Sequence, residues 1–100
     1  MKAVDKQVIT GEKYILRLFV AGDGLESTQA EERIVQLCES QLQQRYELDV
    51  IDVLENPVAA LDNHVVVTPM LILVEPPPRV TILGDLRDTD KVLAAFLSYI

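Results

Sequence analysis

The chain has 100 residues, of which 49% are hydrophobic and 25% are charged, a composition typical of one folded globular domain. Its 16 acidic and 9 basic residues leave a net charge of −7, which excludes an electrostatic surface for a nucleic-acid backbone. The single cysteine excludes an intramolecular disulfide, and no apolar run reaches the ~18 residues of a membrane span. We therefore expect a cytoplasmic domain that binds neither nucleic acid nor membrane.

The first structured element is expected at Tyr14 to Val20. Residues 1–11 are polar, too polar for a signal peptide, and are predicted to form a flexible N-terminus ahead of a domain over residues 12–100. Tyr14 to Val20 is rich in strand-forming residues, carries apolar side chains on both faces and is stopped by Gly22 and Gly24. This pattern predicts a buried parallel strand.

A helix followed by a second strand is predicted next. Thr28 and Glu31 have the spacing of a capping box, Ser27 is a second N-cap candidate, and the helix is expected to run to about Gln44. Its buried stripe is predicted to contain Ala30, Ile34, Leu37 and Cys38. A second strand over residues 46–53 completes a βαβ unit, which implies two parallel strands.

The second half of the chain predicts a short helix and two more strands. Asn56 and Pro57 are an N-cap residue and a proline at the first helical position, followed by a helix at Val58 to Leu61. Strands are expected at Met70 to Val74 and at Val80 to Leu83, the second closed by Gly84. Prolines cannot lie inside a sheet, so residues 76–78 must connect these strands, and a tight return makes them antiparallel.

Asp88 or Thr89 is expected to cap a last helix that ends at Ile100. The order βαβαββα is the thioredoxin-like α/β arrangement, a mixed four-stranded sheet with helices on both faces. In that fold a cis proline precedes the third strand. Although only ~5–6% of X–Pro bonds are cis, we therefore expect a cis Thr68-Pro69 bond.

The residues that catalysis would need are absent from the expected places, so we predict no enzyme, no cofactor and no metal. A thioredoxin-type enzyme requires a C-x-x-C motif after the first strand, and residues 22–27 contain no sulfur. Cys38 is interpreted as a core side chain and His64 as a loop residue. Two weaker alternatives stay open: Ser27 as a contact for a thiol ligand, and Gly22-Asp23-Gly24 as a phosphate-binding turn.

Five segments, in order and at the same spacing, resemble the KaiB family of circadian clock proteins. They are Tyr14 to Gly22, Val50 to Pro57, Thr68-Pro69, Pro76 to Pro78 and Ile82 to Leu86. The resemblance implies a non-enzymatic protein that binds the ATPase KaiC, recruits KaiA and competes with the sensor kinase SasA. It also implies two folds, a tetrameric one and a monomeric thioredoxin-like one that binds KaiC.

The resemblance places partner contacts on or beside the first two strands, at Tyr14, Asp49, Asp52, Glu55 and Asn56. The expected partner is a KaiC-like ATPase or a histidine-kinase sensor, with a KaiA-like protein as a further partner. However, Lys and Arg positions of clock KaiB are replaced here by Gln29, Glu32, Asp49, Glu55, His64 and Leu73. The alternative is a KaiB-like domain that has lost KaiC binding and serves another signalling or stress-response partner.

Four positions are interpreted as fold-switch residues: Pro69, Gly84, Ala95 and Leu97. Clock KaiB has Gly and Asp where this chain has Ala95 and Leu97. Both replacements favour a continuous last helix, together by about 1.5 kcal/mol. We therefore expect the thioredoxin-like monomer to dominate, with the tetramer as a minor state.

Overall fold

The computed structural model describes residues 13–43, 45–84, 86–87, 91–92 and 94. The predicted order of elements is confirmed there, and Lys91, Val92 and Ala94 are helical. The remainder of the expected last helix, including Ala95 and Leu97, and the expected flexible N-terminus lie outside the described residues. The elements are β2 (Tyr14–Val20), α1 (Leu25–Gln41), β3 (Tyr46–Asp52), α2 (Pro57–Asp62), β4 (Met70–Glu75) and β5 (Val80–Leu83).

The strands form one mixed sheet in the order β3-β2-β4-β5. β2 and β3 are parallel, from Tyr14 opposite Tyr46 to Val20 opposite Asp52, because α1 carries the chain back along the sheet. β4 is antiparallel to both β2 and β5. The predicted parallel pair and the antiparallel return are therefore confirmed, and β3 and β5 are the edge strands.

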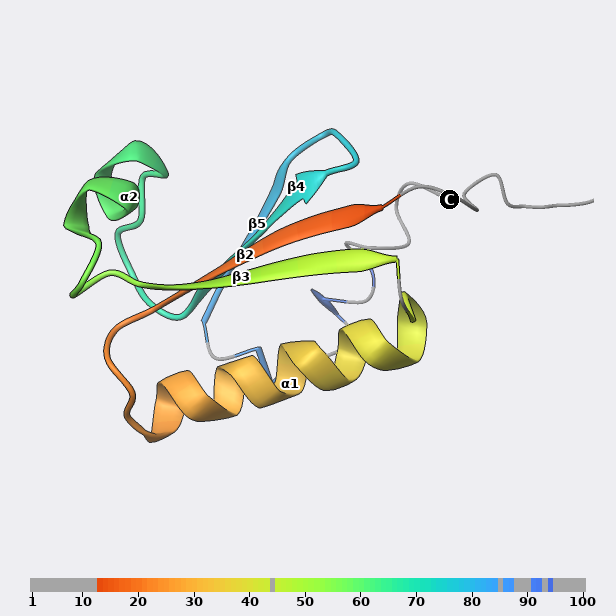
Figure 1. Cartoon of the computed structure of the whole chain (residues 1–100), viewed down its shortest axis with the longest axis horizontal. Helices are drawn as coiled ribbons and strands as arrows, with labels where there is room; N and C mark the ends of the chain where they lie inside the picture. The colour runs from red at the N-terminus through yellow and green to blue at the C-terminus, as the bar shows by residue number, and fades with distance from the viewer. Residues whose placement is uncertain (1–12, 44, 85, 88–90, 93, 95–100) are drawn as a thin grey trace, which may run out of the picture.

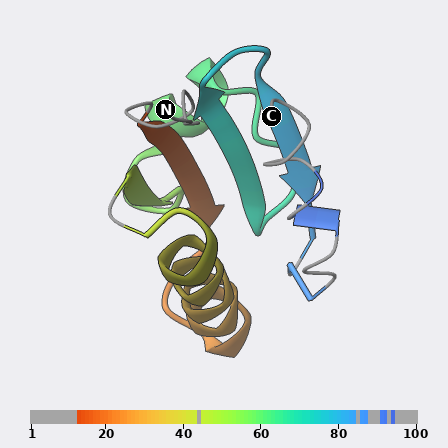
Figure 2. The same ribbon diagram turned by 90° about the vertical axis from the view of Figure 1, so that its right-hand side faces the viewer.

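The main core lies between α1 and one face of the sheet (Figures 1 and 2). Alternate residues of β2, including Leu16 and Leu18, point to this face together with Leu71 and Leu73 of β4. The helix contributes the predicted stripe: Ala30, Ile34 and Cys38 are fully buried, and Leu37 packs beside them.

The opposite face carries a smaller apolar cluster, Phe19, Met70 and Ile72, against which Val65 and Ile51 pack. Figure 1 shows α2 beyond the carboxyl ends of β2 and β3, at the end of the sheet where α1 begins. The thioredoxin-like fold class predicted from the sequence is confirmed by this architecture. In the described part of the chain, no helix has the length and apolar character needed to cross a membrane.

The start of α1 differs from the prediction. The helix begins at Leu25, with Gly24 in an extended conformation at the N-cap and no side-chain cap. The Thr28 hydroxyl donates to the Gly24 carbonyl at 3.1 Å, and the Ser27 hydroxyl donates to the Ala21 carbonyl at 3.3 Å. Both hydroxyls lie inside the first turns and bond backwards, so the predicted capping box is wrong.

The helix also ends earlier than expected, at Gln41. The C-cap residue Leu42 is buried and donates its N–H to the Cys38 carbonyl at 2.7 Å. Gln43 follows with a φ of 53°, in the left-handed region that ends many helices. The left-handed conformation of Gln43 therefore ends α1 before the predicted Gln44.

The Thr68-Pro69 peptide bond is cis, as predicted, and the Glu75-Pro76 and Pro77-Pro78 bonds are cis as well. Pro69 is buried at the start of β4. Gly84 has a φ of 106°, a conformation that disfavours any residue with a side chain, and donates its N–H to the Pro69 carbonyl at 3.0 Å. Two of the residues assigned to fold switching are therefore in direct contact across the β4–β5 pair.

Candidate protein-binding site

Asp52 ties together the two turns that follow β2 and β3. Its Oδ1 accepts the backbone N–H of Gly22 at 2.9 Å and that of Leu54 at 2.9 Å. Its carbonyl accepts the N–H of Glu55 at 3.1 Å and that of Asn56 at 2.9 Å. One residue thus holds the turn into α1 against the turn into α2.

The side chain of Leu54 packs across this junction. A Cβ atom at Gly22 would lie 3.6 Å from Leu54 Cδ1, so the two turns touch. Gly22 has a φ of 76°, which its missing side chain permits without strain. The phosphate-binding alternative for this turn finds no support, because the Gly22 N–H is already bonded to a carboxylate.

α2 begins and ends through local backbone geometry. Asn56 is at the N-cap and Pro57 at the first helical position, as predicted, but the Asn56 side chain does not cap the helix and donates to the Asp52 carbonyl at 3.2 Å. At the other end, His64 donates its N–H to Leu61 at 3.2 Å, and Val65 donates to the Ala60 carbonyl at 2.9 Å. This pair of bonds is a Schellman motif.

Asn63 ties the end of α2 to the sheet. Its Oδ1 accepts Arg17 Nη1 at 3.1 Å and Arg79 Nη2 at 3.5 Å, while its Nδ2 donates to the Ala59 carbonyl at 2.8 Å. Arg17 lies on the sheet face opposite α1, beside Asp49 in the β2–β3 register. α2 is therefore held at both ends, by Asp52 and by Asn63.

Between these supports, α2 turns apolar side chains to solvent. Val58 and Leu61, three residues apart on one side of the helix, are 67% and 76% exposed. Among the described residues, every exposed large apolar side chain except Val50 and Leu83 lies in this part of the fold. We call this region the α2-end surface: Leu25, Leu54, Val58, Leu61, Val66 and Val67, with the exposed acids Glu55 and Asp62.

The predicted contact residues are not all in one place. Asp49, Glu55 and Asn56 are exposed, the first on the edge strand β3 and the other two beside α2. Asp52 is half-buried, and its carboxylate is engaged in the bonds described above. Tyr14 is only 3% exposed and belongs to the main core at the opposite end of β2, so the prediction that it contacts a partner does not agree with its burial.

Sequence reasoning missed the apolar part of this surface. Val58 and Leu61 were expected only as members of a short helix, and Leu54 and Val66 were not considered. The signal available in the sequence was a short helix, predicted at Val58 to Leu61 and observed at Pro57–Asp62, which is too short to bury a full apolar stripe of its own. Which of its apolar residues remain uncovered depends on packing at the end of the sheet.

Cys38 and Tyr46 lie away from the α2-end surface, and the pKa of each is raised. Burial raises the pKa of the Cys38 thiol to about 12, helped by the nearby negative charge of Glu39. The Tyr46 hydroxyl donates to Glu39, and this bond raises the pKa of Tyr46 to about 12. Within the described residues, no group of three His, Cys, Asp or Glu side chains is placed to hold a metal ion.

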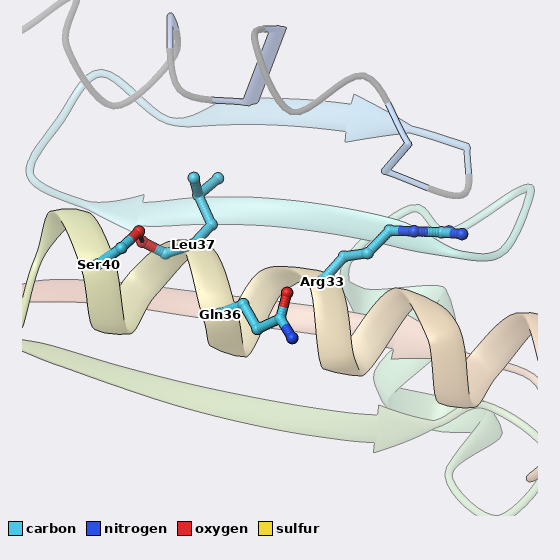
Figure 3. A pocket seen from close by; sticks show the side chains of 4 residues that line it. All are labelled: Arg33, Gln36, Leu37 and Ser40. Atoms are coloured by element: carbon cyan, nitrogen blue, oxygen red, sulfur yellow. Dashed lines mark hydrogen bonds between the residues drawn. The ribbon is translucent and has the colours of Figure 1, made fainter.

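A hollow of about 220 Å³ on the flank of α1 is lined by Arg33, Gln36, Leu37 and Ser40 (Figure 3). All four side chains come from the same helix, and Leu37 packs against the main core. Ser40 donates its hydroxyl to the Leu37 carbonyl at 3.1 Å. The hollow thus pairs no nucleophile with a base, and its shape follows from the spacing of side chains along one helix.

Known proteins are similar to this chain in sequence, and solved structures are similar to it in fold. Circadian clock protein KaiB3 of Synechocystis sp. is 41% identical over 81 residues, which cover 81% of this chain and 79% of that protein. Circadian clock oscillator protein KaiB of Microcystis aeruginosa is 44% identical over 80 residues, which cover 80% of this chain and 77% of that protein.

Among solved structures, the N-terminal domain of Synechococcus elongatus SasA has a TM-score of 0.75 at 24% identity, over 100% of this chain and 96% of that domain. The Drosophila melanogaster thioredoxin Deadhead has a TM-score of 0.69 at 16% identity, over 90% of this chain and 86% of that protein. Both likenesses show a thioredoxin-like fold. The KaiB domain matches residues 17–97, and the chain belongs to the KaiB family.

Proposed function

We propose that this chain is a non-catalytic protein-binding module of the KaiB type, acting in the cytoplasm in a circadian clock or a clock-derived signalling system. Its partner is a KaiC-type ATPase or a histidine-kinase sensor, with a KaiA-like protein as a further candidate. The thioredoxin-like monomer is its main state and the tetramer a minor one.

The α2-end surface is the observation that carries this proposal. Val58 and Leu61 are exposed on a helix that hydrogen bonds of Asp52 and Asn63 hold at both ends. Apolar side chains presented by a supported element favour contact with another protein. The turn where thioredoxin enzymes carry two cysteines has none here, and Cys38 is buried in α1.

A second candidate, a KaiB-type module that no longer binds KaiC, is favoured by charge. Glu32, Asp49 and Glu55 are exposed at positions where clock KaiB carries basic residues toward an acidic KaiC surface. Like charges facing one another slow encounter and cost up to several kcal/mol.

Titration of a clock KaiC with this chain, with ATP and without nucleotide, separates the two candidates. We expect weak, nucleotide-dependent binding at low salt if KaiC recognition is retained, and no binding at any salt concentration if it is lost. Tight binding at physiological salt would contradict the charge argument.

The non-catalytic part of the proposal has its own test, the reduction of insulin by dithiothreitol. The chain should leave the rate unchanged. An acceleration that survives Cys38→Ser would disprove this part of the proposal, because Cys38 is the only thiol in the sequence.

A further inference from the structure

Among the described residues, the charges on the side of α2 that faces the turns into α1 and α2 have one sign. Lysine and arginine are absent from residues 18–32 and 46–78, the two stretches that contain this end of the molecule. Four of the exposed acids in these stretches lie in or beside the first turn of α1 and in or beside α2: Asp23, Glu26, Glu55 and Asp62. None of them forms an ion pair with another described residue.

The basic side chains that reach α2 are engaged on the sheet. Arg17 and Arg79 both donate to Asn63 Oδ1 at the C-terminal end of the helix. The side of α2 next to the turns into α1 and α2 therefore has apolar side chains, Leu54 and Val58, with carboxylates beside them and no positive charge among the described residues.

We infer that the α2-end surface binds a protein surface with an apolar centre and a rim of Lys or Arg. This inference rests on the second candidate of the proposed function, a KaiB-type module that no longer binds KaiC, and adds the chemistry of its partner. The exposed leucines and valines supply the apolar contact, while Glu55 and Asp62 select a basic rim over an acidic one. Charge complementarity of this kind sets which partner is accepted and how fast it associates.

A second copy of the chain is a poor occupant of the same surface. Two copies would bring Glu55 and Asp62 of one against the same acids of the other, and each chain carries a net charge of −7. A nucleic acid is excluded by the same sign of charge. A basic protein surface is the occupant that both the apolar and the charged residues fit.

The test uses two synthetic amphipathic helical peptides with identical leucine spacing, one with Lys and one with Glu at its polar positions. The probe is titrated into ¹⁵N-labelled full chain and followed by NMR. We expect the Leu/Lys peptide to bind with shifts centred on Leu54, Val58 and Leu61, at least tenfold more tightly than the Leu/Glu peptide. Binding should weaken as salt rises.

Variants separate the two parts of the inference. Val58→Ser with Leu61→Ser should weaken Leu/Lys binding about tenfold or more, since it removes apolar contact. Glu55→Gln with Asp62→Asn should weaken it about threefold to tenfold and flatten the salt dependence. Leu83→Ser is the matched control, because Leu83 is 52% exposed, lies on the edge strand β5 with β2 and β4 between it and β3, and is not one of the residues of the α2-end surface.

Equal binding of both peptides, or shifts centred away from α2, would overturn the inference. So would self-association of the wild-type chain in sedimentation that Val58→Ser with Leu61→Ser abolishes, because it would make a second copy the occupant. Failure of the proposed function is recognised separately, by insulin reduction or by the KaiC titration, neither of which uses these peptides.

Discussion

At the scale of single residues, Asp52 shows how one side chain can hold two turns of the chain together. The resemblance to KaiB placed Asp52 among the contacts, yet its carboxylate accepts two backbone N–H groups from two different turns. Its contribution is to hold α2 and the turn into α1 in a fixed relation.

Asp52→Ala should therefore lower the free energy of unfolding by about 1–3 kcal/mol, since two N–H groups lose a charged acceptor. Asp52→Asn keeps an oxygen at the same place and should retain most of the stability. Urea unfolding of the three proteins measures the difference. Equal stability of the alanine variant and the wild type would show that these bonds contribute nothing.

His64 is strained where α2 ends. It has a φ of 57° at the position of the Schellman motif where glycine is preferred. His64→Gly should stabilise the protein by about 0.5–1 kcal/mol. Glycine removes the backbone strain of the folded state, and this gain exceeds the entropy cost of ordering a more flexible unfolded chain. His64→Ala, which keeps the strain, should change little. A melting temperature of His64→Gly below that of His64→Ala would contradict this assignment.

Cys38 makes stability depend on alkaline pH. Its folded pKa, raised to about 12 by burial, lies above the ordinary value of 9.0. The stability that this shift contributes is complete below pH 9.0 and is lost as pH rises toward the folded pKa, because the unfolded thiol ionises first. Between about pH 8 and about pH 10 the loss should be roughly 1 kcal/mol.

Urea unfolding at these two pH values, for the wild type and for Cys38→Ala, measures this loss. The alanine variant is less stable overall but should show a smaller change with pH. Tyr46, whose pKa is raised by its bond to Glu39, is present in both proteins and cancels in the comparison. An identical pH dependence in the two proteins would rule out Cys38 as the source.

At the scale of elements, the sequence predicted correctly the strands and helices that show a periodic apolar pattern. It failed at the ends of α1, whose positions depend on local hydrogen bonds. Tyr14–Val20 is apolar on both faces and Ala30, Ile34 and Cys38 repeat at helical spacing, so both elements were predicted correctly. The start of α1 was wrong because hydroxyls at Ser27 and Thr28 bond equally well to carbonyls behind them. Whether these hydroxyls cap the helix or bond to earlier carbonyls depends on the conformation of the preceding turn.

The last element carries the prediction about fold preference. Ala95 and Leu97 are better helix formers than the Gly and Asp of clock KaiB, and we expect them to favour the thioredoxin-like monomer about tenfold. Ala95→Gly with Leu97→Asp should shift the population toward the tetramer. Sedimentation velocity compares the two proteins at equal concentration. A wild type already near four chains in mass would contradict the expectation.

At the scale of the whole molecule, the sequence predicted the fold, and its contact candidates were polar residues and Tyr14, with none of the exposed apolar residues of α2 among them. Asp49, Glu55 and Asn56 are charged or polar residues in segments of recognisable KaiB pattern, and the structure exposes all three. The exposure of Val58 and Leu61 follows from the position of α2 beyond the strands. That position depends on long-range bonds, from Arg17 to Asn63 and from the Gly22 N–H to Asp52. Local sequence does not show such packing.

The fold of the chain and the charges on its surface lead to opposite expectations for KaiC binding. The fold retains the KaiB arrangement, while Glu32, Asp49 and Glu55 carry charge of the wrong sign for an acidic surface. If the surface is used as proposed, restoring basic residues should recover recognition, and removing the apolar residues should abolish it again.

The most direct measurement is the affinity for a clock KaiC with ATP of the variant Glu32→Lys, Asp49→Lys, Glu55→Lys. We predict nucleotide-dependent binding well above that of the wild type, strongest at low salt. Adding Val58→Ser and Leu61→Ser should abolish this gain, and adding Leu83→Ser should leave it intact. No gain from the lysines, or an equal loss from Leu83→Ser, would contradict a binding surface at the α2 end.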